Sequence, residues 1–283
     1  MTTKTIDTLV PDILDVVDGK GGWDLAISEF FGDRLGETAM SRFNPEPREP
    51  TLRMSSLGTP CTRKLWFSVN TPEAGEELRP ETKLKFFYGD ILEELLLSLA
   101  AAAGHTVEGC QDELEIGGIK GHRDAVIDGV TVDVKSASTY SFGKFKNHLL
   151  ETDDPFGYLS QLSSYVYAAK DDPLVKDKTG GAFLVVDKQH GKLCLDYYNL
   201  EGLLKEKEKE VEDIKNVVSR IVLPPRGFRD VPEGKSGNRR LDVGCSYCSF
   251  KYACWPRLRT FLYSNGPKYL TEVKKEPMVK EKR

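Results

Sequence analysis

The stretch GHRDAVIDGVTVDVKSAS, residues 121–138, decides the fold of this chain. Apolar and polar residues alternate up to Asp128-Gly129 and alternate again after it. An Asp-Gly pair between two such runs is a strong signal for a β-hairpin with a two-residue turn. With the turn fixed there, Asp124 faces Asp133 across the hairpin. The sequence therefore predicts two antiparallel strands that bring two carboxylates together.

The parity of the second strand of this hairpin places Thr131, Asp133 and Lys135 on one face. Directly opposed residues have Cβ atoms about 4.5–5.5 Å apart, where like charges destabilise the pair. A divalent cation between Asp124 and Asp133 reverses that effect, and hard carboxylate oxygens suit Mg²⁺ or Mn²⁺. Lys135 could then position or deprotonate a water, or stabilise charge on a phosphate. The alternative interpretation is a solvated strand face that carries acids and a lysine.

Periodicity along the rest of the chain predicts a mixed α/β protein. Helical spacing of apolar residues covers 82–103, with Gly104 as a stop, and also covers 156–170 and 200–221. Strand-like runs cover DELEI (112–116), GAFLVV (181–186) and KLCLDYY (192–198). We expect residues 1–50 to be mostly helical with a loop at NPEPREP, a short helix to begin at Cys61, STYSFGKFKNH (138–148) to be a loop, and the tail from about Lys268 to be frayed.

Bulk composition excludes several classes of protein. The chain has 283 residues, 39% of them hydrophobic, and a net charge of -4 with a sequence pI of about 5.7. It does not coat nucleic acid through global positive charge, although a nucleic-acid enzyme needs only locally basic walls. No apolar run of about 18 residues predicts a membrane span, and no secretory signal is present, so we expect a cytoplasmic protein. Disulfides are disfavoured there.

Three motifs together resemble the PD-(D/E)XK nuclease superfamily in its RecB-type branch. The string of residues 121–138 is similar to its Asp…(Asp/Glu)-x-Lys core. Gly89-Asp-Ile-Leu-Glu93 is similar to its Gly-x-x-x-His/Glu helix motif, and Gln161-x-x-x-Tyr165 to its Gln-x-x-x-Tyr motif. The resemblance implies a restriction-endonuclease-like core, a mixed sheet flanked by helices. It implies Mg²⁺ or Mn²⁺ ligands and residues that assist catalysis or contact DNA: Glu93, Asp124, Asp133 and the Val134 carbonyl as ligands, with Lys135, Gln161 and Tyr165.

Two of these positions have competing interpretations. Many iron–sulfur members of the branch carry His where this chain has Glu93, and Glu resembles the phage recombination exonucleases. Glu93 could otherwise be an ordinary exposed helix acid, like its neighbour Glu94. Lys144 and Lys146, interleaved with aromatic residues, could line a DNA path or simply be solvated.

Cysteine spacing predicts a second metal centre. Cys245-x2-Cys248-x5-Cys254 puts three thiolates within reach of one centre, and Cys61 is the candidate fourth ligand. The arrangement resembles the iron–sulfur staple of AddB-type and CRISPR-associated nucleases, which implies a [4Fe–4S] cluster. Zinc is the alternative, although it usually prefers two Cys-x2-4-Cys pairs. The two remaining cysteines, Cys110 and Cys194, lie in strand-like segments and are interpreted as core residues.

The resemblance implies four regions: an N-terminal helical extension (1–50), a nuclease core (51–223), a cysteine-rich module (224–264) that closes onto Cys61, and a charged tail (265–283). It also implies a deoxyribonuclease, an exonuclease that acts on the ends of linear single- or double-stranded DNA in phage-type recombination, repair or replication, with a possible partner protein there. The alternatives are a CRISPR spacer-processing nuclease, a non-catalytic iron–sulfur DNA-binding subunit, and a zinc-bound scaffold. Membrane association is not expected.

Overall fold

The structure, a computed structural model, describes residues 4–45 and 49–282. The chain forms two compact units. Unit 1 comprises residues 1–49, 53–58 and 79–212, and unit 2 comprises residues 50–52, 59–78 and 213–283. The first fifty residues therefore belong almost entirely to unit 1, and Cys61 lies in the same unit as the three C-terminal cysteines. The loop expected at NPEPREP falls partly on residues 46–48, outside the described residues.

A mixed five-stranded sheet forms the centre of unit 1. Its strand order is β1-β4-β5-β6-β7, in which β5 and β6 are parallel and every other neighbouring pair is antiparallel. The connection between the two parallel strands runs through helices, as a parallel crossover requires. The strands are β1 (Val107–Glu108), β4 (Ala125–Ile127), β5 (Val130–Ala137), β6 (Gly180–Asp187) and β7 (Lys192–Asn199).

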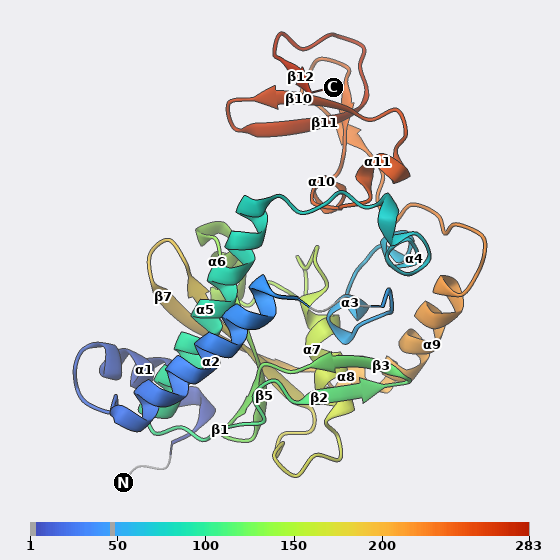
Figure 1. Ribbon diagram of the computed structural model, residues 1–283. Helices are drawn as coiled ribbons and strands as arrows, with labels where there is room; N and C mark the ends of the chain where they lie inside the picture. The colour runs from blue at the N-terminus through green and yellow to red at the C-terminus, as the bar shows by residue number, and fades with distance from the viewer. Residues whose placement is uncertain (1–3, 46–48, 283) are drawn as a thin grey trace. The chain divides into compact units, whose positions relative to one another are not determined.

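Helices cover both faces of this sheet (Figure 1). One face of β4, β5 and β6 packs with apolar residues of α1 and α5, and α2 packs on α5. The other face packs with residues of α6 and α7. Because helices cover both faces, most of β5 and all of β6 are buried. The helices are η1 (Ile6–Thr8), α1 (Leu9–Val17), α2 (Leu25–Phe43), α3 (Met54–Leu57), α5 (Pro80–Ala102), α6 (Thr139–Lys146), α7 (Tyr158–Ala168) and α8 (Glu201–Lys205).

The predicted hairpin turn is confirmed, and its first strand is corrected. Asp128 and Gly129 both have positive φ, at 51° and 86°, as a type I′ turn requires. However, the strand expected through HRDAVI is broken before Ala125. Residues 119–122 form β3 (Ile119–His122), which pairs with β2 (Glu113–Ile116) in a separate two-stranded sheet. The main ladder begins at Ala125 opposite Val132.

Arg123 explains this break. Its side chain is 1% exposed, and it donates to Asp112 at 2.6 Å, to Asp172 at 2.5 Å and to the Gly109 carbonyl at 3.0 Å. Burying a charged guanidinium is tolerated only with such partners. The chain therefore turns at Arg123 to complete this network, and Asp124 follows outside any ladder.

The segment expected to be a basic-aromatic loop is the helix α6, so that prediction is wrong. Ser138 caps the helix by accepting from the Ser141 N–H at 3.3 Å. Phe142 and Phe145, three residues apart, are both buried against the sheet. A loop prediction followed from the glycine and the polar residues, but the aromatic pair outweighs them.

Unit 2 contains four of the six cysteines and a second five-stranded sheet, with the strand order β12-β10-β11-β9-β8. The tail expected to be frayed from about Lys268 instead supplies two of these strands, so that prediction is wrong. The elements are α4 (Thr62–Asn70), η2 (Pro72–Ala74), β8 (Val231–Pro232), β9 (Arg239–Arg240), α10 (Val243–Ser246), α11 (Lys251–Cys254), β10 (Arg259–Tyr263), β11 (Gly266–Glu272) and β12 (Glu281–Lys282), with α9 (Lys207–Val218) crossing the boundary between the units.

Among the described residues, no helix is long and apolar enough to cross a membrane.

Candidate metal and active site

Two of the predicted acids lie at the start of the central hairpin. Asp133 is on β5 and is 4% exposed. Asp124 precedes β4, and its Oδ2 accepts a hydrogen bond from the Val134 N–H at 2.7 Å. This bond replaces the expected cross-strand pairing. It ties Asp124 to the strand that carries Asp133, so the two carboxylates remain neighbours although Asp124 is outside the ladder.

Helix α5 brings Glu93 to these acids. A Cβ atom on Gly89 would lie 3.3 Å from the Ser136 Oγ of β5, so glycine permits the close approach of helix and strand. Glu93 follows Gly89 by four residues and lies on the same helix face. Its Oε1 accepts from Gln111 Nε2 at 2.7 Å. Sequence reasoning missed Gln111, because nothing in the local pattern distinguishes it.

The neighbouring Glu94 has a different environment. Arg34 of α2 donates to both carboxylate oxygens of Glu94, at 2.6 and 3.0 Å, and Thr38 donates to one of them at 3.2 Å. A second ion pair, between Arg42 and Asp90, joins the same two helices at 2.5 Å. Glu94 and Asp90 therefore hold α2 against α5. Glu93 alone of the three acids is directed to the site.

The charges of these acids act on one another and raise their pKa values. Burial raises the pKa of Glu93 to about 9, and the charges of Asp124, Glu94 and Asp133 add to the rise. Burial also raises the pKa of Asp124 to about 7, with the Asp133 charge as the next cause. Carboxylates that raise each other's pKa are typical of functional sites and of sites that hold a cation.

Lys135 lies among these acids. Its Nζ is 2.5 Å from Asp133 Oδ2 and 5.4 Å from the centre of the Tyr158 ring. Burial lowers the pKa of Lys135, but the charges of Asp133 and Asp124 outweigh burial and raise it above its usual value. Lys135 is therefore an ammonium group in the metal-free protein. Sequence reasoning missed Tyr158, which sits outside the Gln-x-x-x-Tyr spacing.

Helix α7 supplies the other two predicted residues. Gln161 and Tyr165 are one turn apart, and a hydrogen bond between their side chains partly offsets the burial and nearby acids that raise the pKa of Tyr165. Tyr165 is 5% exposed, and the charges of Asp133 and Asp124 act on it. The structure thus brings Glu93, Asp124, Asp133, Lys135, Gln161 and Tyr165 into one electrostatic neighbourhood.

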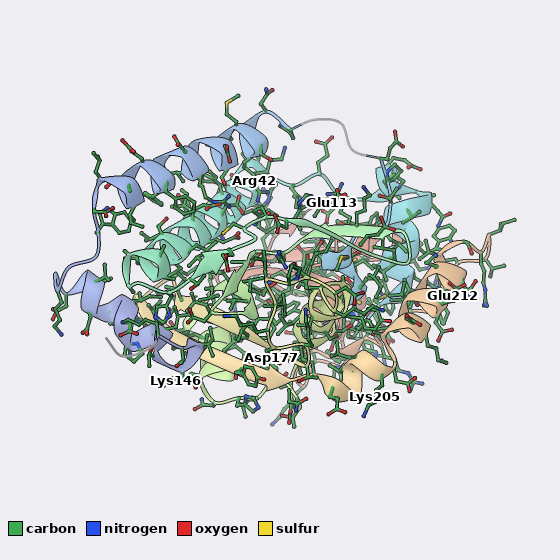
Figure 2. All side chains as sticks on the ribbon, turned by 90° about the horizontal axis from the view of Figure 1, so that it is seen from below. Arg42, Glu113, Lys146, Asp177, Lys205 and Glu212 are labelled. Atoms are coloured by element: carbon green, nitrogen blue, oxygen red, sulfur yellow. The ribbon has the colours of Figure 1, made fainter. Side chains whose placement is uncertain are left out.

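The two candidate DNA-contacting lysines differ. Lys144 is mostly covered and pairs with Asp153 at 2.8 Å, so its charge is already partly compensated. Lys146 is exposed at the end of α6 (Figure 2). Of the pair, Lys146 has the environment that a phosphate contact needs.

The donor set fits a hard divalent cation. The charges of the three carboxylates act on one another, and oxygen ligands are those that Mg²⁺ and Mn²⁺ prefer. As the side chains lie, residues 4–45 and 49–282 contain no group of three or more His, Cys, Asp or Glu residues placed to hold a metal ion. Lys135 and Gln111 contact oxygens of Asp133 and Glu93 that such an ion would take. Cation binding therefore requires these two contacts to rearrange.

The four candidate cluster cysteines are all half-buried in unit 2. Cys61 is the N-cap of α4, and Cys245 and Cys248 flank one turn closed by a 3.1 Å bond from the Cys248 N–H to the Cys245 carbonyl. Burial raises the pKa of Cys245 to about 12, and the charges of Cys61, Cys248 and Cys254 raise it further. The other three sulfur atoms are therefore close enough to Cys245 to act on it electrostatically.

Basic and small residues surround the same thiols. Arg63 donates to Cys254 Sγ at 3.7 Å. A Cβ atom on Gly227 would lie 2.9 Å from Cys61 Cα and 3.0 Å from Cys61 Sγ, so glycine permits the close approach of residue 227 to Cys61. Sulfur donors beside a cation suit an iron–sulfur or zinc centre, which would take them as thiolates. The other two cysteines, Cys110 and Cys194, are partly buried against the two cores of unit 1.

Comparisons with known proteins add little to this description. No protein-family model matches the sequence, and no curated protein matches it. Among solved structures, the crystal structure of SSO0001 is similar, with 17% sequence identity, a TM-score of 0.42, and coverage of 81% of this chain and 96% of that one. The protein is a mixed α/β protein with a mixed sheet flanked by helices.

Proposed function

We propose that this chain is a divalent-metal-dependent deoxyribonuclease of the PD-(D/E)XK type that acts on DNA ends. The observation that carries the proposal is that Glu93, Asp124 and Asp133 act on one another electrostatically, beside the ion pair of Asp133 with Lys135 on β5. Helix α5 supplies Glu93, the residue before β4 is Asp124, and β5 supplies Asp133 and Lys135. Three motifs of the same nuclease family occur on three different elements of unit 1. Residues that serve only to stabilise the fold would rarely match all three motifs.

Each residue has a role that its environment supports. Glu93, Asp124, Asp133 and the Val134 carbonyl would hold Mg²⁺ or Mn²⁺, which would supply an activated water and neutralise charge on the phosphate. Lys135, released from Asp133 when that carboxylate binds the cation, would place its ammonium beside the developing phosphorane charge. Gln161 and Tyr165 would orient Lys135 and contact the DNA backbone.

The distribution of charge supports a nucleic-acid substrate. Unit 1 carries 22 Lys and Arg residues against 34 Asp and Glu residues, and unit 2 carries 18 against 10. The net charge of -4 is therefore the sum of an acidic unit, which holds the candidate metal site, and a basic unit, which holds the four candidate cluster cysteines. A basic unit attracts polyphosphate even though the whole chain is acidic.

The four thiols of unit 2 belong to the same proposal. We infer a [4Fe–4S] cluster held by Cys61, Cys245, Cys248 and Cys254, with zinc as the alternative metal. Its role is structural, because it joins residue 61 to a segment almost two hundred residues later.

The test compares linear and covalently closed DNA. Wild-type protein with Mg²⁺ or Mn²⁺ should degrade end-labelled linear DNA, and EDTA should abolish this. Covalently closed circles of the same sequence should survive if ends are required. Asp124→Asn should remove cleavage in every case, because the variant loses a ligand charge while its amide oxygen can still accept from Val134. Cleavage that is insensitive to EDTA, or that survives in Asp124→Asn, would refute the assignment.

A further inference from the structure

Unit 2 contains a cavity of about 380 Å³ that the proposed nuclease reaction does not use. Residues of the β8–β9 hairpin, the start of β11 and the end of α10 line it. Small-molecule sites in proteins have volumes of about 300–1,000 Å³. The cavity therefore has room for a small ligand.

Two cations share one carboxylate at this cavity. The Arg240 Nε on β9 lies 2.8 Å from Glu233 Oε2, and Lys268 on the neighbouring strand β11 contacts the other oxygen, Oε1. Within the described part of the chain, Glu233 is the one acid that lines the cavity. A guanidinium and an ammonium together have more N–H donors than two carboxylate oxygens can accept. The cavity therefore has a surplus of positive charge and of hydrogen-bond donors.

The wall that carries Glu233 is fixed by its own hydrogen bonds. The turn after Glu233 is closed by a 2.8 Å bond from the Glu233 N–H to the Asn238 carbonyl. Asn238 is 4% exposed, and its side-chain oxygen accepts from the N–H groups of Lys274 and Lys275, at 2.8 Å each. A site whose walls are ordered before binding loses less conformational entropy when a ligand enters.

We propose that this cavity binds a small phosphorylated ligand, whose phosphate group contacts Arg240 and Lys268. The planar guanidinium matches two phosphate oxygens, and the ammonium adds a point charge. A phosphate dianion suits two cations better than a carboxylate does, because it has more charge and a third acceptor oxygen. The phosphate takes donors that Glu233 now holds, so Glu233 competes with the ligand.

The experiment titrates the full chain with inorganic phosphate, dAMP and deoxyadenosine by calorimetry. EDTA is present, so no divalent cation contributes to binding. Arg240→Gln and Lys268→Gln should each weaken the binding of phosphate and dAMP about tenfold, as the loss of a charge-assisted hydrogen bond does. Glu233→Gln should tighten binding of both by a similar factor, because the competing negative charge is removed. Melting temperatures verify that each variant is folded.

The neighbouring residue Arg239 provides the matched control. Its side chain is also on β9 and is 37% exposed, against 42% for Arg240, and it pairs with Asp230 at 2.7 Å. It is not among the residues that line the cavity. Arg239→Gln removes the same charge from the same strand and should bind phosphate like wild type.

Several outcomes would overturn the inference. These are no binding of phosphate or dAMP by wild type, equal weakening in Arg239→Gln and Arg240→Gln, weaker binding in Glu233→Gln, or wild-type affinity in Lys268→Gln. Binding of deoxyadenosine as tight as that of dAMP would also overturn it. Tighter binding of dAMP than of phosphate supports a nucleotide as the ligand, and equal binding supports phosphate itself. The measurement involves no cleavage, so its result is independent of the nuclease proposal.

Discussion

The adjacent residues Glu93 and Glu94 have different roles in the protein. Glu93 and Glu94 are consecutive acids on one helix, yet Glu94 is held by a bidentate guanidinium and Glu93 by a single amide donor. A carboxylate that is fully paired stabilises the fold. A carboxylate that is buried near other acids costs stability unless a cation joins it.

The two acids should therefore give opposite results on conversion to glutamine. Glu94→Gln breaks a nearly buried ion pair and should lower the free energy of unfolding by about 2–4 kcal/mol, with cleavage kept at temperatures where the variant folds. Glu93→Gln should leave stability equal or slightly higher and should remove metal-dependent cleavage. Chemical denaturation of both variants, together with the nuclease assay, checks this. Equal effects of the two substitutions would contradict the division of roles.

The raised pKa values of Glu93 and Asp124 also predict how stability depends on pH. Unfolded Glu and Asp titrate near 4.3 and 3.9, so the folded metal-free protein binds more protons than the unfolded chain at higher pH. Stability must then fall as pH rises, through about 7 for Asp124 and about 9 for Glu93. Relative to Glu93→Gln, metal-free wild type should lose stability between pH 5 and pH 9, and Mn²⁺ should restore it. The prediction would be contradicted if the difference in denaturation midpoint between wild type and Glu93→Gln stayed constant from pH 5 to pH 9.

At the scale of elements, helix α7 depends on one close backbone contact. Gly157 caps α7 with φ of 75°, and a Cβ atom there would lie 1.5 Å from the Gly58 carbonyl oxygen. No side chain fits that space. The contact fixes where α7 begins, and thereby where Gln161 and Tyr165 lie.

Gly157→Ala should therefore lower the free energy of unfolding by more than about 3 kcal/mol, because a steric clash adds to the strained φ. Gly191→Ala is the matched control. Gly191 has a similar φ of 67°, but its Cβ atom would meet open space, so the loss should be only about 1 kcal/mol. Thermal or urea denaturation measures both. A loss for Gly191→Ala as large as that for Gly157→Ala would show that φ, and not the Gly58 contact, sets the cost.

At the scale of the whole molecule, the chain separates an acidic unit from a basic, cysteine-bearing unit. The account expects the cysteines to hold a metal centre that stabilises unit 2. Anaerobically purified protein should be brown with broad visible absorption if the centre is iron–sulfur, and colourless if it is zinc.

Substitution identifies the ligands. Cys61→Ser and Cys248→Ser should each lose the colour and the bound iron, and should lower the melting temperature. Cys194→Ser, a cysteine in the core of unit 1, should keep both iron and colour. Iron and sulfide analysis with the absorption spectrum provides the readout. Retention of a full cluster in Cys61→Ser would remove Cys61 from the ligand set.

Most of the fold follows from local patterns in the sequence, and the exceptions have physical causes. The turn at Asp128-Gly129 and the helix that carries Glu93 were predictable, because turn chemistry and apolar spacing are local. The break at Arg123 was not, since it depends on partners at positions 109, 112 and 172. The candidate site residues follow from the motif resemblance and their roles stay a prediction, whereas Gln111 and Tyr158 approach them only through tertiary packing.

The central claim is that Lys135 serves a metal-dependent reaction on DNA. The most direct measurement is single-turnover cleavage of end-labelled DNA with Mn²⁺ by wild type and by Lys135→Ala, both shown to retain their metal centre and their melting temperature. The account predicts that wild type cleaves and that the variant is slower by at least about a hundredfold, in line with the loss of one electrostatic donor. Equal rates, or no cleavage by intact wild type on single- or double-stranded ends, would contradict it.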